Sequence, residues 1–155
     1  GLNHLGPEYI AAQLQKFRSG IRGAAGSSAT AMQMAPMAAL LADEDAVQNV
    51  ALYISDLPDT TAVSSATGDI SLGADYYNQF CGACHGAAAQ GNLALNSPRL
   101  SGGSDWYLEA QLLAFRAGTR GSHLDDRTGR QMRAMAAVLP SEQAVRDVVA
   151  FISSL

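Results

Sequence analysis

The sequence predicts an all-α protein, and three features of the chain lead to that class. Apolar residues recur at helical spacing in several segments, and no segment shows the β-branched alternation of a strand. A C-x-x-C-H sequence formed by Cys81, Cys84 and His85 is the attachment signature of a c-type haem. Aromatic residues make up only 6% of the chain. A small helical domain built around haem needs little aromatic bulk, because the macrocycle fills much of the core.

The helices expected in the second half follow from this periodicity. Pro140, Ser141 and Glu142 form an N-terminal helix signature, so the last helix begins there. A Gly- and Ser-rich loop is expected at 86–103 and a polar loop at 118–130. The segments with helical spacing lie at 72–80, 106–117, 131–138 and from 141 to near the end.

The chain contains an internal repeat at a shift of 98 positions. Residues 9–23 match residues 107–121, and the match continues without a gap to Leu57 and Leu155. About two dozen aligned positions are identical, which indicates a tandem duplication. The repeat places three helices in the first copy, at 8–19, 31–40 and 44–57.

The two copies differ at their beginnings. Gly1 corresponds to Arg99, so the first copy starts after the point where its own C-x-x-C-H would stand. Either an N-terminal portion with a first haem site is missing from this sequence, or the first copy has lost that site; we expect truncation. The small, polar and turn-prone residues 58–68 predict a linker. The predicted domains are therefore a partial one at 1–57 and a complete one at 69–155.

Other chemistry is possible at a C-x-x-C pair. Zinc needs four ligands, but the chain has no third cysteine and its other histidines are His4 and His123. A thioredoxin-like redox pair follows a strand in a βαβ unit, and the flanking residues have no strand pattern. A structural disulfide across so short a loop is uncommon. We therefore predict that Cys81 and Cys84 attach a haem.

Charge and hydropathy exclude several classes of partner. The formal net charge is −4 and Lys16 is the single lysine, so no basic patch is available for nucleic acid. No apolar run approaches the roughly 20 residues of a membrane span. No secretory signal is visible, yet bacteria attach c-type haem outside the cytoplasm, so we expect a processed precursor.

His85 stands next to the second cysteine and is placed to ligate the haem iron from one face. On the other face the candidates are Met132, Met135 and His123. Methionine opposite histidine raises the reduction potential, as suits an electron carrier. Both methionines have counterparts in the first copy, whereas His123 matches an alanine, so a shared role for His123 is disfavoured. Spacing does not choose between Met132 and Met135.

Several ordered motifs resemble one family of proteins. Besides the haem signature, the residues that carry the resemblance are Pro98-Arg99-Leu100 and the segments 107–120 and 132–139. Together they look like class I c-type cytochromes, and above all like the two-domain, two-haem cytochrome c4 group of the bacterial periplasm. The resemblance covers nearly the whole chain, because 2–57 match the latter part of the same domain. The departure is the missing first C-x-x-C-H.

The resemblance implies roles for individual residues. It places Met132 as the axial methionine, and Pro98 as the residue whose carbonyl accepts the ring N–H of His85. Arg116 and Arg120 are expected near the haem propionates, and a solvated surface position is the competing reading. If the first copy holds a second haem, Met34 is its axial methionine. By the same resemblance, Gly73 and Tyr77 of the first helix pack on Phe151 of the last.

The function implied is electron transfer through covalently bound haem c, without catalysis, in the periplasm. Iron held by both His85 and Met132 has no open position for a substrate. Expected partners are a quinol-oxidising complex as donor and a haem–copper oxidase as acceptor, and a partner or a lost N-terminal anchor could attach the protein to a membrane. The alternatives are an electron-accepting cytochrome subunit of a dehydrogenase, a dihaem peroxidase-like enzyme, and a haemless first copy that serves as a docking module.

Overall fold

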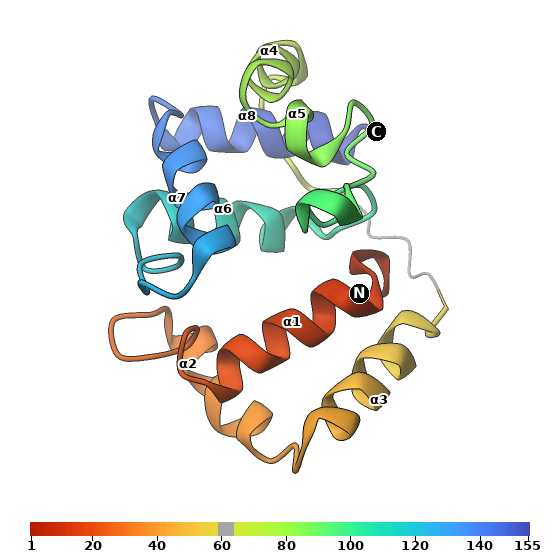
Figure 1. Ribbon diagram of the computed structural model, residues 1–155. Helices are drawn as coiled ribbons and strands as arrows, with labels where there is room; N and C mark the ends of the chain where they lie inside the picture. The colour runs from red at the N-terminus through yellow and green to blue at the C-terminus, as the bar shows by residue number, and fades with distance from the viewer. Residues whose placement is uncertain (59–63) are drawn as a thin grey trace.

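The computed structural model describes residues 1–58 and 64–155, and within them it is helical (Figure 1). Part of the predicted linker, residues 59–63, lies outside the described residues. One isolated antiparallel bridge, between Asn92 and Ser97, is the only β pairing in the described ranges. The class predicted from the sequence, all-α, is therefore confirmed. None of the described helices is long and apolar enough to cross a membrane. The helices are α1 (Pro7–Arg18), α2 (Ala29–Ala39), α3 (Glu44–Ser55), α4 (Ile70–Phe80), α5 (Gly82–His85), α6 (Asp105–Ala117), α7 (Arg127–Ala137) and α8 (Glu142–Ser153), with short 3-10 turns η1 (Asn3–Leu5) and η2 (Leu93–Leu95).

The internal repeat reappears in the helix boundaries. Adding 98 to both ends of α2 gives the bounds of α7, and the same shift turns α3 into α8. Helix α6 begins 98 residues after α1 and runs one residue longer. The helices form two groups that lie against each other, α1–α3 and α4–α8, and α4 and α5 have no counterpart among the described helices of the first group (Figure 1). We call these the first and second helical groups.

Two expectations about the second helical group were wrong in detail. Helix α7 begins at Arg127, four residues before the predicted start, because the carboxylate of Asp126 accepts a hydrogen bond from Gly129 N at 2.9 Å and caps the helix. The first turn of α7 carries no apolar residue, so periodicity could not reveal it. The loop predicted at 86–103 also contains the single 3-10 turn η2.

The core of the second helical group forms where α4 crosses α8. Four large apolar side chains of α8 are almost fully buried there: Val145, Val148, Val149 and Ile152. Gly73 lies against the backbone of α8, and the ring of Tyr77 lies 5.3 Å from the ring of Phe151. The helix crossing expected from the resemblance is thus present. It fixes the end of α4, from which the C-x-x-C-H turn continues.

The first helical group has a smaller core and a more open surface. Ile10 and Ala11 of α1 are buried against Val47 and Ala51 of α3. Tyr53, the repeat counterpart of Phe151, is 69% exposed. In the second group, α4 covers the side of α8 that carries Phe151. Among the described residues, no helix covers the side of α3 that carries Tyr53.

Residues 64–68, the last part of the predicted linker, pack on the second helical group. The carboxylate of Asp105 accepts hydrogen bonds from the hydroxyls of Ser64 and Ser65 and from Ser65 N. A Cβ at Gly68 would overlap the backbone of Arg146. Immediately afterwards, Asp69 N donates to the side chain of Asp147 at 2.9 Å.

Candidate haem site

The C-x-x-C-H motif forms a single helical turn. Helix α4 ends at Phe80. The next residue, Cys81, still donates from its N–H to Tyr77 O at 2.8 Å, and α5 follows at once. The N–H of His85 closes this turn by donating to Cys81 O at 3.0 Å. Both cysteines are free thiols; Cys81 is half-buried and Cys84 is exposed. Burial raises the pKa of the Cys81 thiol to about 11, and the neighbouring Cys84 adds to the rise.

His85 is held in one orientation and one tautomer. Its side chain is 4% exposed, and Nδ1 lies 2.9 Å from the carbonyl oxygen of Pro98. Because a carbonyl can only accept, Nδ1 carries the hydrogen and Nε2 keeps its lone pair. Nε2 is buried without a hydrogen-bond partner among the described residues. Burial lowers the pKa of His85, which keeps the imidazole neutral and able to bind a metal ion.

The loop after the motif brings Pro98 to His85. The hydroxyl of Tyr77 donates to Gly86 O at 2.7 Å, which ties the start of the loop to α4. Gly91 N donates to His85 O at 2.8 Å, and Leu100 N donates to Ala89 O at 2.8 Å. These bonds fold residues 86–100 back on themselves, so the Pro98 carbonyl faces the imidazole.

The three candidates for the second axial position lie in different surroundings. Met132 is half-buried on α7, whereas Met135 is 38% exposed, one turn further along the same helix. The side chain of His123 is 42% exposed and its Nδ1 accepts from Asp125 N. Met34, the repeat counterpart of Met132, is 40% exposed on α2.

These residues fit a covalently attached haem better than they fit a bare metal ion. Two free thiols and a buried, unpartnered imidazole nitrogen stand on one turn of backbone. Among the described residues, no three His, Cys, Asp or Glu side chains come together as a metal-binding group. A zinc site of the usual kind therefore has no ligand set in the described part of the chain.

The family model for cytochrome c matches residues 70–155, which hold the whole of this arrangement. The chain belongs to the cytochrome c family. Proteins of this family are electron carriers that bind haem c covalently, and Cys81 and Cys84 lie in the motif that attaches it. The expected cofactor and the expected function of electron transfer are therefore confirmed.

Curated relatives extend the similarity into the first helical group. A thiosulfate dehydrogenase electron acceptor of Stutzerimonas stutzeri is 38% identical over an alignment of 138 positions, which covers 83% of this cytochrome and 60% of that protein. A cytochrome c4 of Azotobacter vinelandii is 28% identical over 160 residues, covering 97% of this chain and 73% of that one. The cytochrome thus spans about three fifths of the length of the first of these relatives.

Solved structures show the same fold. The cytochrome c4 of Acidithiobacillus ferrooxidans matches with a TM-score of 0.77 at 25% identity, over 98% of this chain and 86% of that chain. A thiosulfate dehydrogenase of Marichromatium purpuratum matches with a TM-score of 0.73 at 25% identity, over 97% of this chain and 31% of the other. Both similarities cover both helical groups of this cytochrome.

The two arginines expected near the haem make different contacts in this cytochrome. Arg116 donates from Nε to Leu139 O at 3.2 Å and from Nη2 to Pro140 O at 3.3 Å, and so holds the turn between α7 and α8. In the first copy Arg18 makes the equivalent bond to Ala42 O at 3.3 Å. Arg116 is thus engaged with the backbone of its own helical group.

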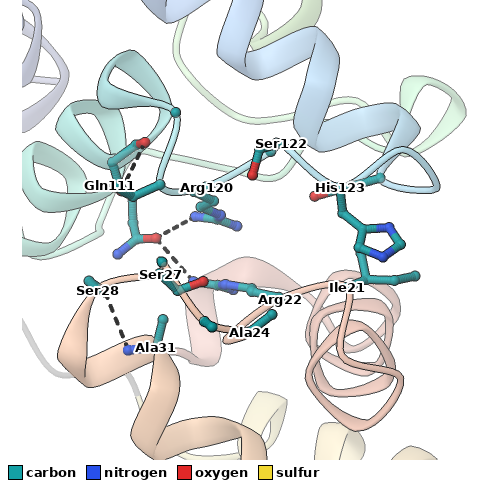
Figure 2. Close-up of a pocket in the computed structure, with 17 residues that line it drawn as sticks. Ile21, Arg22, Ala24, Ser27, Ser28, Ala31, Gln111, Arg120, Ser122 and His123 are labelled. Carbon is teal, nitrogen blue, oxygen red and sulfur yellow. Dashed lines mark hydrogen bonds between the residues drawn. The ribbon is translucent and has the colours of Figure 1, made fainter.

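Arg120 lies where the two helical groups meet. It donates to Oε1 of Gln111 at 2.6 Å and crosses to the first group, where it donates to Oε1 of Gln13 at 3.0 Å and to the hydroxyl of Tyr9 at 3.1 Å. Arg22, its repeat counterpart, donates to Gln13 at 2.8 Å. It also donates to Gln111 at 3.0 Å, so that Gln111 accepts from both arginines (Figure 2). The contact between the groups is therefore close to two-fold symmetric.

A cavity of about 320 Å³ opens beside these arginines, between the loop at 21–31 and the loop at 118–126. Figure 2 shows Arg22 and Arg120 on facing sides of it, with Ser122 and His123 from the second group nearby. Nε of Arg22 is buried and has no hydrogen-bond partner among the described residues. Burial, followed by the charge of Arg120, lowers the pKa of Arg22. This contact could not be predicted from the sequence, because helical periodicity does not indicate how two groups of helices pack together.

Proposed function

We propose that this cytochrome is a periplasmic, cytochrome c4-like carrier that moves single electrons through a haem with His85 and Met132 as axial ligands. The observation that carries the proposal is the buried Nε2 of His85, which has no partner in the described part of the chain. Histidine opposite methionine gives the iron a raised reduction potential and leaves it no open position. When bound, the haem supplies a one-electron couple.

The protein's own residues hold and orient these ligands. The Pro98 carbonyl accepts the Nδ1–H of His85, which fixes the ring and raises the basicity of Nε2. Met132 is the more buried of the two methionines on α7. The repeat does not choose between them, because Met132 and Met135 both have methionine counterparts in the first copy, Met34 and Met37.

Optical spectroscopy tests the axial ligand. Ferric haem bound by methionine has a weak charge-transfer band at the red end of the spectrum, and this band is expected in the native cytochrome. Met132→Ala should abolish the band. Met135→Ala, one helical turn away on the same helix, is the matched control and should keep it. Loss of the band in the Met135 variant alone would transfer the role to Met135.

We also propose that the first helical group belongs to a second haem domain, with Met34 as its axial methionine. Support comes from the matching helices and from three exposed apolar side chains, Met34, Met37 and Tyr53, at 40%, 60% and 69%. In the second group, the equivalent side of α8 packs on the helix that leads into the haem motif. The haem-to-polypeptide ratio of the native protein is the test. A ratio of one would leave Met34 without this role.

For the haem propionates we propose Arg120 in the second group and Arg22 in the first. Both guanidiniums border the cavity between the groups, and neither has an acidic partner among the described residues. Two half-buried like charges favour an anion beside them. Arg116 is less suited, because it does not border this cavity and its guanidinium holds the backbone at Leu139 and Pro140 instead.

Two sets of redox partners are proposed for this cytochrome, one from its resemblance to cytochrome c4 and one from a curated relative. We propose a quinol-oxidising complex as donor and a haem–copper oxidase as acceptor. The second candidate is the role of electron acceptor for a dehydrogenase, and the 38% identical relative that is a thiosulfate dehydrogenase electron acceptor favours it. Stopped-flow reduction of the ferric protein by a thiosulfate dehydrogenase with its substrate, compared with reduction by a quinol-oxidising complex, separates the two. Faster reduction by the dehydrogenase would favour the second role.

A peroxidase-like function is disfavoured by this ligand set, because peroxide needs an open iron position. The charge-transfer band of the methionine ligand should persist after reduction, reoxidation and addition of peroxide. Rapid loss of the band with consumption of peroxide would contradict the carrier function and support a dihaem peroxidase-like enzyme.

A further inference from the structure

Lys16 reaches from the last turn of α1 to the start of α7 in the other helical group. Its Nζ lies 2.6 Å from Oδ1 of Asp126 and 2.8 Å from Oγ1 of Thr128. The side chains of Lys16 and Asp126 are 19% and 5% exposed. Solvent and salt screen such a pair much less than they screen a surface ion pair.

The carboxylate that receives Lys16 also begins the helix. Oδ1 of Asp126 accepts from Gly129 N at 2.9 Å, and the negative charge faces the positive end of the helix. A Cβ at Gly129 would overlap this carboxylate, so the first turn of α7 fits closely around it. Among the described residues Lys16 is the sole ion-pair partner of Asp126.

The contact runs in one direction only. Ala114 stands 98 positions after Lys16, and its side chain ends at Cβ. Asp126 corresponds to Ser28, which caps α2 without a charge. The arginine and glutamine contacts between the groups are therefore symmetric, whereas the ion pair of Lys16 with Asp126 has no equivalent between Ala114 and Ser28.

Helix α7 also carries Met132, six residues after its cap, or about 9 Å along the helix axis. Removing Lys16 would leave a nearly buried carboxylate without its counter-charge, which is strongly unfavourable. The first turn of α7 would then open more often. We propose that Lys16 is a positioning residue that fixes the start of α7 and so holds Met132 at the haem iron. This inference rests on the proposed role of Met132 as axial ligand.

Neighbouring cations cannot take the place of Lys16. Arg22 and Arg120 line the same cavity as Asp126, but their donors are engaged with Gln13 and Gln111. The effect of losing Lys16 should therefore not be masked by a substitute ion pair.

The test uses the haem-loaded full chain and three variants. Lys16→Met keeps the apolar stem and removes the charge, and Lys16→Arg restores the charge. Arg146→Met removes one positive charge from a half-buried pair within the second group, with Glu109 at 3.8 Å, and controls for net charge. Two measurements are made: competition of added imidazole with the methionine of the ferric protein, followed by the charge-transfer band, and amide hydrogen exchange in the first turn of α7.

In Lys16→Met we expect imidazole to bind the haem iron about tenfold more tightly. The amides of Gly129 and Arg130 should exchange about tenfold faster. Both changes are of the size expected for the loss of one ion pair that is partly shielded from solvent. Lys16→Arg should recover much of both effects, and Arg146→Met should match the native protein. An unchanged imidazole affinity in Lys16→Met would overturn the proposal, even if exchange became faster, because Lys16 would then support only the helix. Absence of the band from the native protein would instead refute the proposed methionine ligation, and the positioning role with it.

Discussion

Arg22 and Arg120 occupy the same position in the two copies, and both donate to the side-chain oxygen of Gln111, at 3.0 and 2.6 Å. Gln13 accepts from the same pair at 2.8 and 3.0 Å. Each amide oxygen thus bridges two positive charges that would otherwise repel each other across the contact. The guanidiniums also stack on aromatic rings of their own copies, at 4.5 Å for Phe17 and 4.4 Å for Phe115.

Replacing Gln111 with leucine should weaken this contact. Both arginines lose an acceptor in a partly buried place, so we expect the free energy of unfolding to fall by about 1–3 kcal/mol. Urea denaturation of the haem-loaded protein measures the loss. Gln15→Leu is the matched control, because Gln15 accepts only from Arg18 of its own helix, and about 0.5 kcal/mol is expected there. Equal losses in the two variants would argue against a special role for Gln111.

Gly73→Ala tests the crossing of α4 and α8. A Cβ at this position would overlap the carbonyl oxygen of Asp147, so the helices would have to move apart. Overpacking of this kind should cost about 3 kcal/mol or more, and thermal unfolding should show it as a clear fall in Tm. Gly82→Ala is the control, since its Cβ would meet the ring of Tyr77 at an ordinary distance of 3.5 Å. A tolerated alanine at position 73 would contradict the close packing.

Much of this fold could be predicted from the sequence, because the repeat and the haem motif each constrain many residues. The crossing of Gly73 and Tyr77 with Phe151 followed from the resemblance and is present. The early start of α7 was missed, because a polar cap and a polar first turn leave no apolar pattern. The separate tasks of Arg116 and Arg120 were also missed, since both stand near the end of one helix and differ only in what the tertiary structure places beside them.

Tyr77 should make stability depend on pH in the alkaline range. Burial raises the pKa of Tyr77 to about 12, from about 10 in an unfolded chain. Between these values the unfolded chain has lost the phenol proton and the folded protein still holds it, so the free energy of unfolding falls as pH rises, by at most about 3 kcal/mol in total.

The variant Tyr77→Phe should lose this slope. It should also be about 1 kcal/mol less stable near neutral pH, because the bond to Gly86 O is gone. Denaturant titrations at several pH values measure both effects. Tyr53→Phe is the control, since Tyr53 is 69% exposed. A slope that persists in the Tyr77 variant would assign the alkaline dependence to another group.

Changing Arg116 and Arg120, the two arginines near the end of α6, to methionine one at a time should have different effects. Arg116→Met should lower the free energy of unfolding by about 1 kcal/mol, because the turn after α7 loses its donor, and leave the reduction potential near that of the native protein. Arg120→Met should lower the potential, because a cation beside the proposed propionate site favours the ferrous haem. Potentiometric titration of both variants is the measurement. A shift in the Arg116 variant alone would reverse the two assignments.

The near-symmetric meeting of the two helical groups has a meaning for the history of the chain. A surface on which residue i of one copy contacts residue j of the other, and j contacts i, is the self-complementary kind that a symmetric homodimer uses. An ancestral single-domain cytochrome with this arginine, glutamine and tyrosine could have paired with itself. Once two copies were joined in one chain, their encounter no longer depended on protein concentration. Within one chain each copy can change independently of the other. Lys16, which has alanine at the equivalent position of the second copy, is a difference of this kind.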